Sequence, residues 1–345
     1  MRAVFITRIG LPDAALKLRD ADPPAPAGRQ VLIRVRAFGV NFADVLARTG
    51  MDLETPRMPY VPGFEVAGTV EAVGPDCRSA VVGSRVAAIT EMGGYAELAL
   101  ADESFVVPLP EALSWTDAAA IPVNGAAAWL ALKGLTWAPC VRAGDRVLVH
   151  AAAGGSGLMA VQIALDAGCE VFGTVGSDIK VEFLKGLGVH HPMNHTIADV
   201  EAEVRKASGG HGLDLVLDSV GGDSISMAMR MLAPSGRLVS IGVSSMTPRT
   251  TRSLVATGVG LLKAPVLHPY ALLGESKGFL GLNLRRIAAN RPKVVRDALI
   301  AVMQMVAEGR LKPHVDSIFP LDATAAAHER LHGRCSIGKV VVTVG

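Results

Sequence analysis

Short apolar runs separated by glycine and proline dominate the chain up to about residue 120. Runs of this kind, rich in β-branched residues and bordered by turn residues, are typical of strands. They occur at residues 31–35, 65–73, 85–89 and 95–100. The pattern therefore predicts an antiparallel, barrel-like unit.

The pattern changes near residue 145. A buried strand at 146–150 leads into a glycine-rich turn and an alanine-rich helix at 157–166. Strands at 170–174, 213–218, 237–241 and 278–282 then alternate with helices at 179–187 and 224–232. Such alternation predicts a parallel sheet with helices on both faces. A long helix at 294–308 and a last strand at 339–344 follow, and this strand is expected to return to the first unit.

Length and composition agree with two units. The chain has 345 residues and is half apolar, and a domain averages roughly 150 residues. Its 34 basic and 32 acidic residues leave a formal charge of +2 with no basic block. We therefore expect no nucleic-acid partner and a small neutral molecule instead.

Neither export nor a membrane span is expected. The N-terminal stretch carries Arg2 and Arg8 and lacks the layout of a secretory signal, so a cytoplasmic protein is predicted. Glycine, proline and Lys263 interrupt the apolar stretch at 255–273, leaving less than the ~20 residues of a spanning helix.

The four cysteines are far apart and form no CxxC pair. Pairs at ligand spacing are the usual sign of a zinc site. We predict four buried, reduced thiols, at Cys77, Cys140, Cys169 and Cys335.

The turn after the strand at 146–150 carries the strongest local motif, Val147-Leu-Val-His-Ala-Ala-Ala-Gly-Gly-Ser-Gly157. Ala152, Gly154 and Gly157 occupy the places of a G-x-G-x-x-G fingerprint between a strand and a helix. Small residues there let the backbone approach a pyrophosphate, and the helix N-terminus offers its N–H groups. A structural glycine-rich turn is the alternative, but the strand–turn–helix context favours dinucleotide binding.

The end of the next strand, Phe172-Gly-Thr-Val-Gly-Ser177, bears on which dinucleotide binds. An NAD enzyme places an acidic residue there for the ribose 2′-OH. Gly176 and Ser177 instead leave room for a 2′-phosphate, to which Lys180 can donate. Asp178 counts against this reading, and Lys180 alone would be an ordinary solvated residue. Together the residues favour NADPH.

Many ordered segments resemble the zinc-free quinone oxidoreductase branch of the medium-chain dehydrogenase/reductase superfamily, which includes zeta-crystallin-like and vesicle amine transport protein-like members. The resemblance covers nearly the whole chain, and agreement over so many segments is more specific than one glycine motif. The segments include Gly39-Val-Asn-Phe-Ala-Asp-Val-Leu-Ala-Arg-Thr-Gly50, Pro62-Gly-Phe-Glu-Val-Ala-Gly-Thr-Val70, Gly93-Gly-Tyr-Ala-Glu97, Asp218-Ser-Val-Gly-Gly222, Gly309-Arg-Leu-Lys-Pro313 and Ser336-Ile-Gly-Lys-Val-Val341.

The resemblance implies an α/β protein with a GroES-like, β-barrel-type catalytic domain and a Rossmann cofactor domain with a doubly wound parallel sheet. The expected bounds are 1–122 and 288–345 for the catalytic domain and 123–287 for the NADPH-binding domain. A homodimer is expected by the same analogy.

The resemblance also implies the cofactor residues. Asn41 is expected beside the nicotinamide ribose, the turn at 154–157 on the pyrophosphate, and His195 stacked on the adenine. The complete set is Asn41, Asn124, Gly154, Gly155, Ser156, Gly157, Thr174, Gly176, Ser177, Lys180, His195, Val220, Ile241, Gly242, Phe279 and Lys339.

No metal site is expected. Zinc-dependent relatives need a Cys, a Gly-His-Glu histidine and a further Cys or His, whereas Phe64 stands at the histidine position in Gly63-Phe-Glu65. His190, His191 and His195 are predicted to lie in a loop and form no HxxxH pair.

These features predict an NADPH-dependent reductase that transfers hydride, without a metal, to a quinone or an α,β-unsaturated carbonyl compound. Alignment of the reactants supplies much of the acceleration in such reactions. One alternative is an enoyl-thioester reductase acting on an acyl carrier protein or coenzyme A, with Arg285, Arg286, Arg291 and Lys293 as docking patch or as a solvated face. Another is a non-catalytic NADPH-binding protein, because function depends on the site and not on the scaffold.

The chain departs from the family pattern near the substrate. Tyrosines common in relatives are replaced in Arg48-Thr-Gly-Met-Asp52, at Gly125 and at His195, so a roomier substrate side is expected. Asn41 and Asp52 are the candidate catalytic residues. Asp52 is read as a proton donor or substrate-orienting group, or as a solvated turn carboxylate. The apolar stretch after Gly258, over 261–278, suits a dimer interface, a substrate entrance or core packing.

Overall fold

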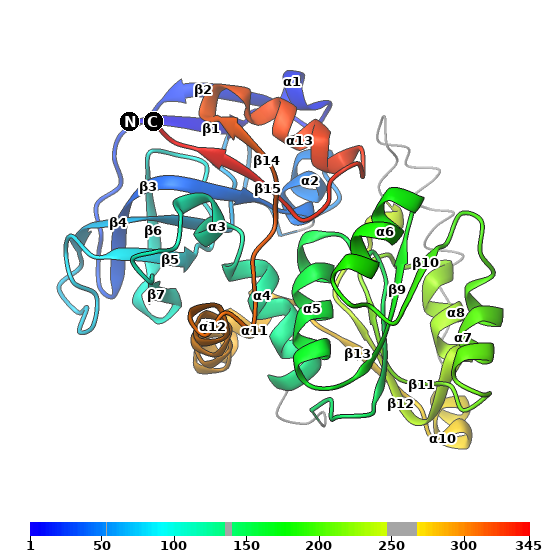
Figure 1. Cartoon of the computed structure of the whole chain (residues 1–345). Helices are drawn as coiled ribbons and strands as arrows, with labels where there is room; N and C mark the ends of the chain where they lie inside the picture. The colour runs from blue at the N-terminus through cyan, green and yellow to red at the C-terminus, as the bar shows by residue number, and fades with distance from the viewer. Residues whose placement is uncertain (53, 135–139, 247–267) are drawn as a thin grey trace. The chain divides into compact units, whose positions relative to one another are not determined.

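The computed structural model describes residues 1–52, 54–134, 140–246 and 268–345 (Figure 1). Among these residues, a first compact unit comprises 1–126 and 284–345, and a second comprises 127–246 and 268–283. The predicted domain borders, after 122 and before 288, are each four residues from the borders of these units. The extent of each folding domain stays a prediction.

The first unit is built on a mostly antiparallel sheet in the order β14-β15-β3-β4-β5-β7, with β6 paired to β3. Among the described strands of this sheet, β14 and β15 alone pair in parallel. Strands β1 and β2 form a separate sheet. The strands are β1 Arg2–Ile6, β2 Leu16–Asp20, β3 Gln30–Val40, β4 Glu65–Val73, β5 Arg85–Ile89, β6 Leu98–Asp102, β7 Val106–Pro108, β14 Val315–Pro320 and β15 Lys339–Thr343.

Alternating side chains of these strands make the core of the first unit. Ile33, Val35, Phe38 and Val66 are all at most 2% exposed and pack in one cluster. At about 25 cal/mol per Å² of buried apolar area, this burial is the main force that holds the strands together. The helices of this unit are α1 Pro12–Ala15, α2 Phe42–Thr49, α3 Trp115–Ala119, α11 Leu284–Asn290, α12 Pro292–Ala307 and α13 Thr324–His332, with short turns η1 Glu103–Phe105 and η4 Leu321–Ala323.

The second unit contains a parallel sheet in the order β10-β9-β8-β11-β12-β13. Its central strands are apolar runs buried on both faces, as expected for a parallel sheet. Leu148, Phe172, Val216 and Leu238 are fully buried in its core. The strands are β8 Arg146–Val149, β9 Glu170–Val175, β10 His191–Asn194, β11 Leu213–Asp218, β12 Leu232–Ser240 and β13 Gly278–Gly281.

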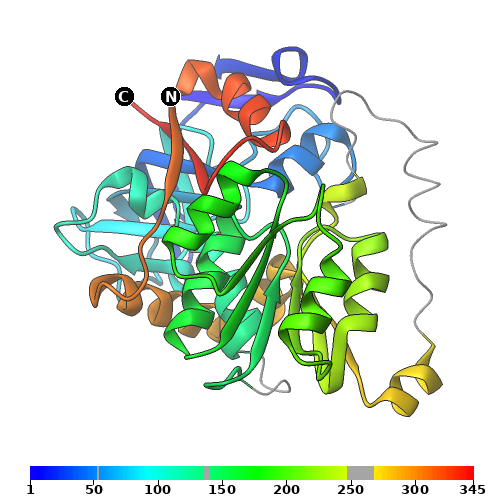
Figure 2. The same cartoon turned by 45° about the vertical axis from the view of Figure 1, so that its right-hand side comes forward.

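Helices cover both faces of this sheet. Figures 1 and 2 show α5 and α6 on one face and α7 and α8 on the other. This arrangement and the antiparallel first sheet confirm the predicted fold class. The helices are α4 Pro122–Trp129, which crosses the border of the units, α5 Gly155–Asp166, α6 Asp178–Gly186, α7 Val200–Ala207, α8 Asp223–Met231 and α10 Pro269–Glu275, with turns η2 Leu130–Gly134 and η3 Ser244–Met246.

Two element predictions are wrong. The segment around His191 is an edge strand, β10, and not a loop. It contains Pro192, which is tolerated at a sheet edge because only one side of the strand needs donors. The strand predicted at 95–100 begins at Leu98, while the backbone N–H of Tyr95 instead donates to Pro62 O at 3.0 Å.

The apolar stretch after Gly258 lies outside the described residues up to residue 267. Further on, α10 exposes Tyr270 by 78% and Leu273 by 75%, so core packing does not explain these two side chains. None of the helices in the described part of the chain is long and apolar enough to cross a membrane.

Candidate functional site

The turn between β8 and α5 depends on missing side chains. A Cβ atom at Gly157 would overlap the carbonyl oxygen of Ala151 and lie 2.9 Å from the Cα of Ala152. Because both obstacles are backbone, only glycine fits there. Gly154 is the N-cap of α5 and no side chain caps this helix. The N-terminus of α5, which begins at Gly155, therefore has no capping side chain from its N-cap residue, and helix N-termini of this kind suit an anion.

The end of β9 brings the predicted 2′-phosphate residues together. A Cβ atom at Gly176 would meet only the Nε2 atom of His195, at 3.6 Å, and His195 N donates to Val175 O at 3.0 Å. Ser177 is the N-cap of α6, yet its side chain makes no capping hydrogen bond. Lys180 lies in the first turn of this helix.

Asp178, which counted against NADPH, is turned toward β10. Its Oδ1 accepts a hydrogen bond of 2.7 Å from Nδ2 of Asn194. The carboxylate therefore has a partner within the protein. This contact depends on strand β10, which the sequence pattern did not indicate.

The loops after β11 and β12 meet through Asp218. Its buried carboxylate accepts from Val220 N at 2.8 Å and from Ser224 Oγ at 2.9 Å, and its carbonyl accepts from Ile241 N at 2.8 Å. A Cβ atom at Gly242 would lie 3.1 Å from Ser219 O. Carboxyl ends of parallel strands meet at one edge, where such sheets bind ligands.

Two predicted cofactor residues have partners inside this unit. Thr174 Oγ1 lies 2.8 Å from Nδ1 of His150, and both side chains are buried. Burial lowers the pKa of His150. Phe279 packs against the apolar core of the sheet. Sequence reasoning did not identify His150 as a site residue. The signal that could have found it is its position, as a polar residue directly after an apolar strand.

A buried polar cluster in the first unit is formed by Asn41, Glu65 and Lys339. Nδ2 of Asn41 donates to Glu65 Oε1 at 2.8 Å, and Lys339 Nζ donates to Asn41 Oδ1 at 2.6 Å. Lys339 and Glu65 also form an ion pair, with side chains 4% and 0% exposed. These contacts fix which way the Asn41 amide points.

The neighbouring elements hold this cluster in place. Asn41 is the N-cap of α2, and its backbone N–H donates to Asp44 Oδ2 at 2.8 Å in a capping box. The other oxygen of Glu65 accepts from Val123 N at 2.8 Å. The next residue in the chain is Asn124, which is also buried. Sequence reasoning missed Glu65 as a site residue.

A second set of buried polar side chains comprises Asp44 of α2, Tyr95 and His328. Burial raises the pKa of Asp44 to about 7. The Tyr95 hydroxyl lies 3.1 Å from Nε2 of His328. Burial, together with the charge of Arg48, lowers the pKa of His328 to about 3. Both groups are therefore poised to be neutral in the folded protein.

Asp52 is an ion-pair partner and not a solvated turn carboxylate. Its Oδ2 lies 3.1 Å from Nη1 of Arg285, and its side chain is 18% exposed. The guanidinium of Arg285 also lies over the Phe64 ring, 5.4 Å from its centre. Whether Asp52 takes part in catalysis stays a prediction.

The predicted basic docking patch is largely neutralised. Arg285 pairs with Asp52, Arg286 pairs with Glu54, and Lys293 Nζ lies 2.7 Å from Asp297 Oδ2. These pairs leave little net positive charge for an acidic carrier protein.

The expected roomier substrate side is wrong at Gly125. A Cβ atom there would lie 2.6 Å from Cγ1 of Val302 in α12. The space that a larger side chain would need is already filled by this helix.

The thiol prediction holds only in part. Cys169 is buried and Cys77 half-buried, whereas Cys140 and Cys335 are exposed, and all four are free. The described residues contain no cluster of three or more His, Cys, Asp or Glu side chains placed to hold a metal. His191 Nε2 lies 2.8 Å from Glu170, and Phe64 is buried.

Comparison with known proteins agrees with this geometry. Residues 27–111 match the model of the alcohol dehydrogenase GroES-like domain, and residues 187–342 match that of the zinc-binding dehydrogenase domain. Quinone oxidoreductase of Homo sapiens is 34% identical over 99% of this chain and 97% of its own length. The chain belongs to the quinone oxidoreductase branch of the medium-chain dehydrogenase/reductase superfamily. This finding confirms the family resemblance.

Two further members of the superfamily are informative. A synaptic vesicle membrane protein VAT-1 homolog of Danio rerio is 32% identical over 99% of this chain and 70% of its own length. The crystal structure of Escherichia coli quinone oxidoreductase complexed with NADPH superposes with a TM-score of 0.87, at 25% identity, covering 99% of this chain and all of the other.

Proposed function

We propose that this protein is an NADPH-dependent oxidoreductase that reduces a quinone or an α,β-unsaturated carbonyl compound without a metal. The main support is the end of β9, where a side chain at Gly176 would find space and Ser177 makes no capping hydrogen bond. The nearby carboxylate of Asp178 accepts from Asn194. A 2′-phosphate needs such space and a cation, which Lys180 supplies. That the related Escherichia coli protein was crystallised with NADPH supports the proposal.

The residues present fit this cofactor. Gly154, Gly155, Ser156 and Gly157 would hold the pyrophosphate, because a helix N-terminus favours an anion and the glycines let the backbone approach it. His195, next to Gly176, would lie against the adenine. Val220, Ile241 and Gly242 would complete the groove in this unit.

Asn41 and Lys339 are the proposed contacts to the nicotinamide half. The cofactor supplies hydride. The chain's part is to fix Asn41 through Glu65 and Lys339, so that its amide meets the ligand in one orientation. A fixed amide loses little entropy on binding, and this favours a well-aligned reacting pair. An enone would receive hydride at its β-carbon and a proton at its α-carbon, whereas a quinone would take up hydride and a proton and end with both oxygens protonated.

The chemistry of the donor set supports metal independence. Phe64, buried and covered by Arg285, stands where zinc-dependent relatives need a histidine. The phenyl ring of Phe64 carries no donor atom for zinc, whose usual ligands are Cys, His and carboxylates. Activation of the substrate would therefore come from its own conjugation.

Two alternative functions are less favoured. The pairing of Arg285, Arg286 and Lys293 with carboxylates weakens the case for an acyl carrier partner. A non-catalytic NADPH-binding role is compatible with the fold. We also propose a homodimer, for which the exposed Tyr270 and Leu273 on α10 are candidate contacts.

The test is turnover of NADPH by the purified protein with a benzoquinone, a simple enone and an enoyl-coenzyme A thioester. The proposal expects oxidation of NADPH with the quinone or the enone. Fastest turnover of the thioester would favour the enoyl-thioester reductase. Tight NADPH binding without turnover of any of the three would favour the binding protein.

A further inference from the structure

A polar pocket lies at the far end of β3 from Asn41. Backbone hydrogen bonds tie three segments together there: Asp76 N donates to Gly28 O, and Glu103 N to Arg29 O, each at 2.9 Å. Arg296 at the start of α12 donates to Glu103 O at 3.2 Å. The walls of the pocket are thus fixed by the fold, so a ligand would find them already in place.

Glu103 is the buried anchor of this pocket. Its Oε1 accepts from Arg78 N and from Ser79 Oγ, each at 2.7 Å, and from Ala80 N at 3.2 Å. Burial opposes ionisation, but these hydrogen bonds outweigh it and lower the pKa of Glu103 to about 2. Its negative charge is therefore stabilised by peptide N–H groups and is already largely compensated.

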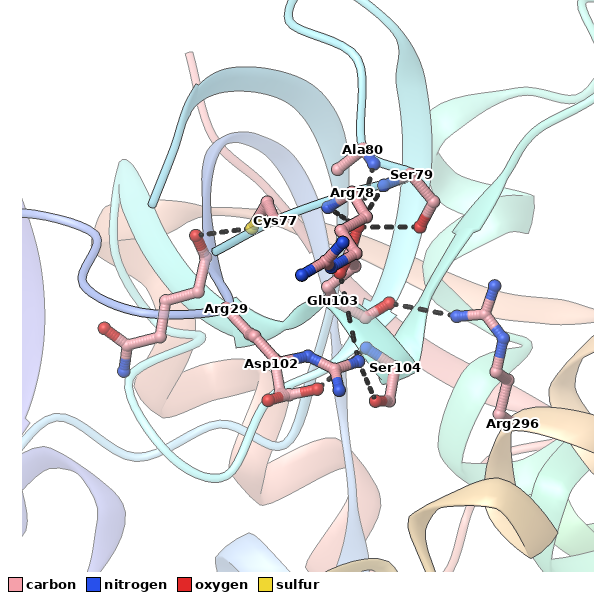
Figure 3. Close-up of polar contacts among 10 residues, drawn as sticks. Arg29, Cys77, Arg78, Ser79, Ala80, Asp102, Glu103, Ser104 and Arg296 are labelled. Carbon is pink, nitrogen blue, oxygen red and sulfur yellow. Dashed lines mark hydrogen bonds and ion pairs between the residues drawn. The ribbon is translucent and has the colours of Figure 1, made fainter. Parts of the chain in front are cut away.

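Three guanidinium groups surround this anchor, as Figure 3 shows for Arg29, Arg78 and Arg296. Arg29 Nη2 donates to Ser104 Oγ at 3.0 Å, and Arg296 uses one N–H on Glu103 O. A guanidinium carries five N–H donors, so both retain donors. The Arg78 side chain makes no hydrogen bond or ion pair within the described residues.

The cavity that these groups line has a volume of about 270 Å³. Its one further carboxylate, Asp76, opposes an anion, but three guanidinium groups and the hydroxyls of Ser79 and Ser104 favour one. Planar forks of donors match the oxygens of a phosphate group. Arg29 precedes β3 and Asn41 follows it, which separates the pocket from the Asn41 cluster by roughly 35 Å at about 3.3 Å per residue.

We propose that this pocket binds a phosphate group, carried by a small phosphorylated metabolite or present as the free ion. It is a second anion site, separate from the dinucleotide turn at β8. Arg78 makes the decisive contact, because its guanidinium has no competing partner among the described residues. Asp76 limits the affinity.

The test is a calorimetric titration of the full chain with inorganic phosphate at constant ionic strength, with NADP⁺ present to fill the dinucleotide site. Loss of one charge-assisted contact costs about tenfold or more in affinity, so Arg78→Gln is expected to weaken phosphate binding by about that factor. Asp76→Asn is expected to tighten it. Arg19→Gln, on the exposed face of β2, removes the same charge elsewhere and should leave binding unchanged.

A second arm replaces inorganic phosphate with ribose 5-phosphate. Tighter binding of the ester than of the free ion identifies a phosphorylated metabolite as the ligand. Equal or weaker binding of the ester identifies the free ion. Either result supports the pocket if Arg78→Gln weakens binding of the probe. Absence of saturable binding of both probes, or equal weakening by Arg78→Gln and Arg19→Gln, overturns the proposal. None of these readouts needs turnover, so they are independent of the proposed reductase activity.

Discussion

The Asn41 cluster and the turn after β8 differ in which atoms determine their geometry. In the cluster, three buried side chains, Asn41, Glu65 and Lys339, hold one another in fixed positions. In the turn, the backbone is the part proposed to contact the ligand, and Gly157 stands where a Cβ atom would meet backbone atoms. A region of the first kind is sensitive to loss of a partner, and one of the second kind to gain of an atom.

The largest effect is expected from Glu65→Gln. It leaves the Lys339 ammonium buried without its counter-charge, and breaking a buried pair costs about 3–5 kcal/mol. Urea unfolding should show a fall of this size in the free energy of unfolding. Glu71→Gln is the control on the same strand, because its pair with Arg34 is exposed, and it should change stability little. Equal effects of the two variants would contradict the account of the cluster.

Gly157→Val tests the turn. The added side chain meets backbone atoms that cannot rotate away, and overpacking costs about 1–3 kcal/mol. Thermal unfolding should show lower stability, and the dinucleotide affinity should fall at least about tenfold. Gly186→Ala in α6, where a Cβ atom has no neighbour within 4 Å, should not lower stability. An unchanged affinity in Gly157→Val would mean that the turn does not hold the ligand.

Lys180→Gln tests the role of the end of β9 in cofactor choice. It should weaken NADPH binding about tenfold, because one charge-assisted contact to the 2′-phosphate is lost, and leave NADH binding unchanged. Lys185→Gln on the same helix is the matched control, since that lysine pairs with Glu182. Equal losses for both cofactors would show that Lys180 does not contact the 2′-phosphate.

The smallest net effect in the wild-type protein is that of pH on the buried groups Asp44 and His328, because their contributions oppose each other. The folded pKa of Asp44, about 7, lies above its ordinary 3.8. Its contribution to stability is thus present below about pH 4 and lost as pH rises to 7. The folded pKa of His328, about 3, lies below its ordinary 6.5, so its contribution is present above 6.5 and lost as pH falls to 3. Between pH 4 and 6.5 the two contributions oppose each other.

Single variants should separate these contributions. In Asp44→Asn the free energy of unfolding should rise with pH over this range, by up to about 1.4 kcal/mol per pH unit. In His328→Gln it should fall with pH. Urea unfolding at several pH values measures both slopes, and slopes of the same sign in the two variants would refute this assignment.

The sequence predicted the local parts of the fold and site well. Apolar runs and turn glycines are signals within a few residues, and they placed β4, β5, β11 and the turn before α5. Strand β10 was missed because His191-Pro-Met-Asn194 has no apolar run. Only its pairing with β9 makes it a strand.

Contacts between distant residues could not be predicted in the same way. The partner of Asp52 is Arg285, 233 residues away, and Lys339 reaches Asn41 over 298 residues. No local pattern encodes such pairs, because the fold brings them together. For the same reason the substitution at Gly125 suggested space that Val302 in fact fills.

The most direct test of the proposed cofactor choice is to titrate the wild-type protein with NADPH and with NADH, following nicotinamide fluorescence. We expect NADPH to bind at least about tenfold more tightly, the worth of one charge-assisted contact to the 2′-phosphate. Equal binding, or tighter binding of NADH, would contradict the assignment of Gly176, Ser177 and Lys180.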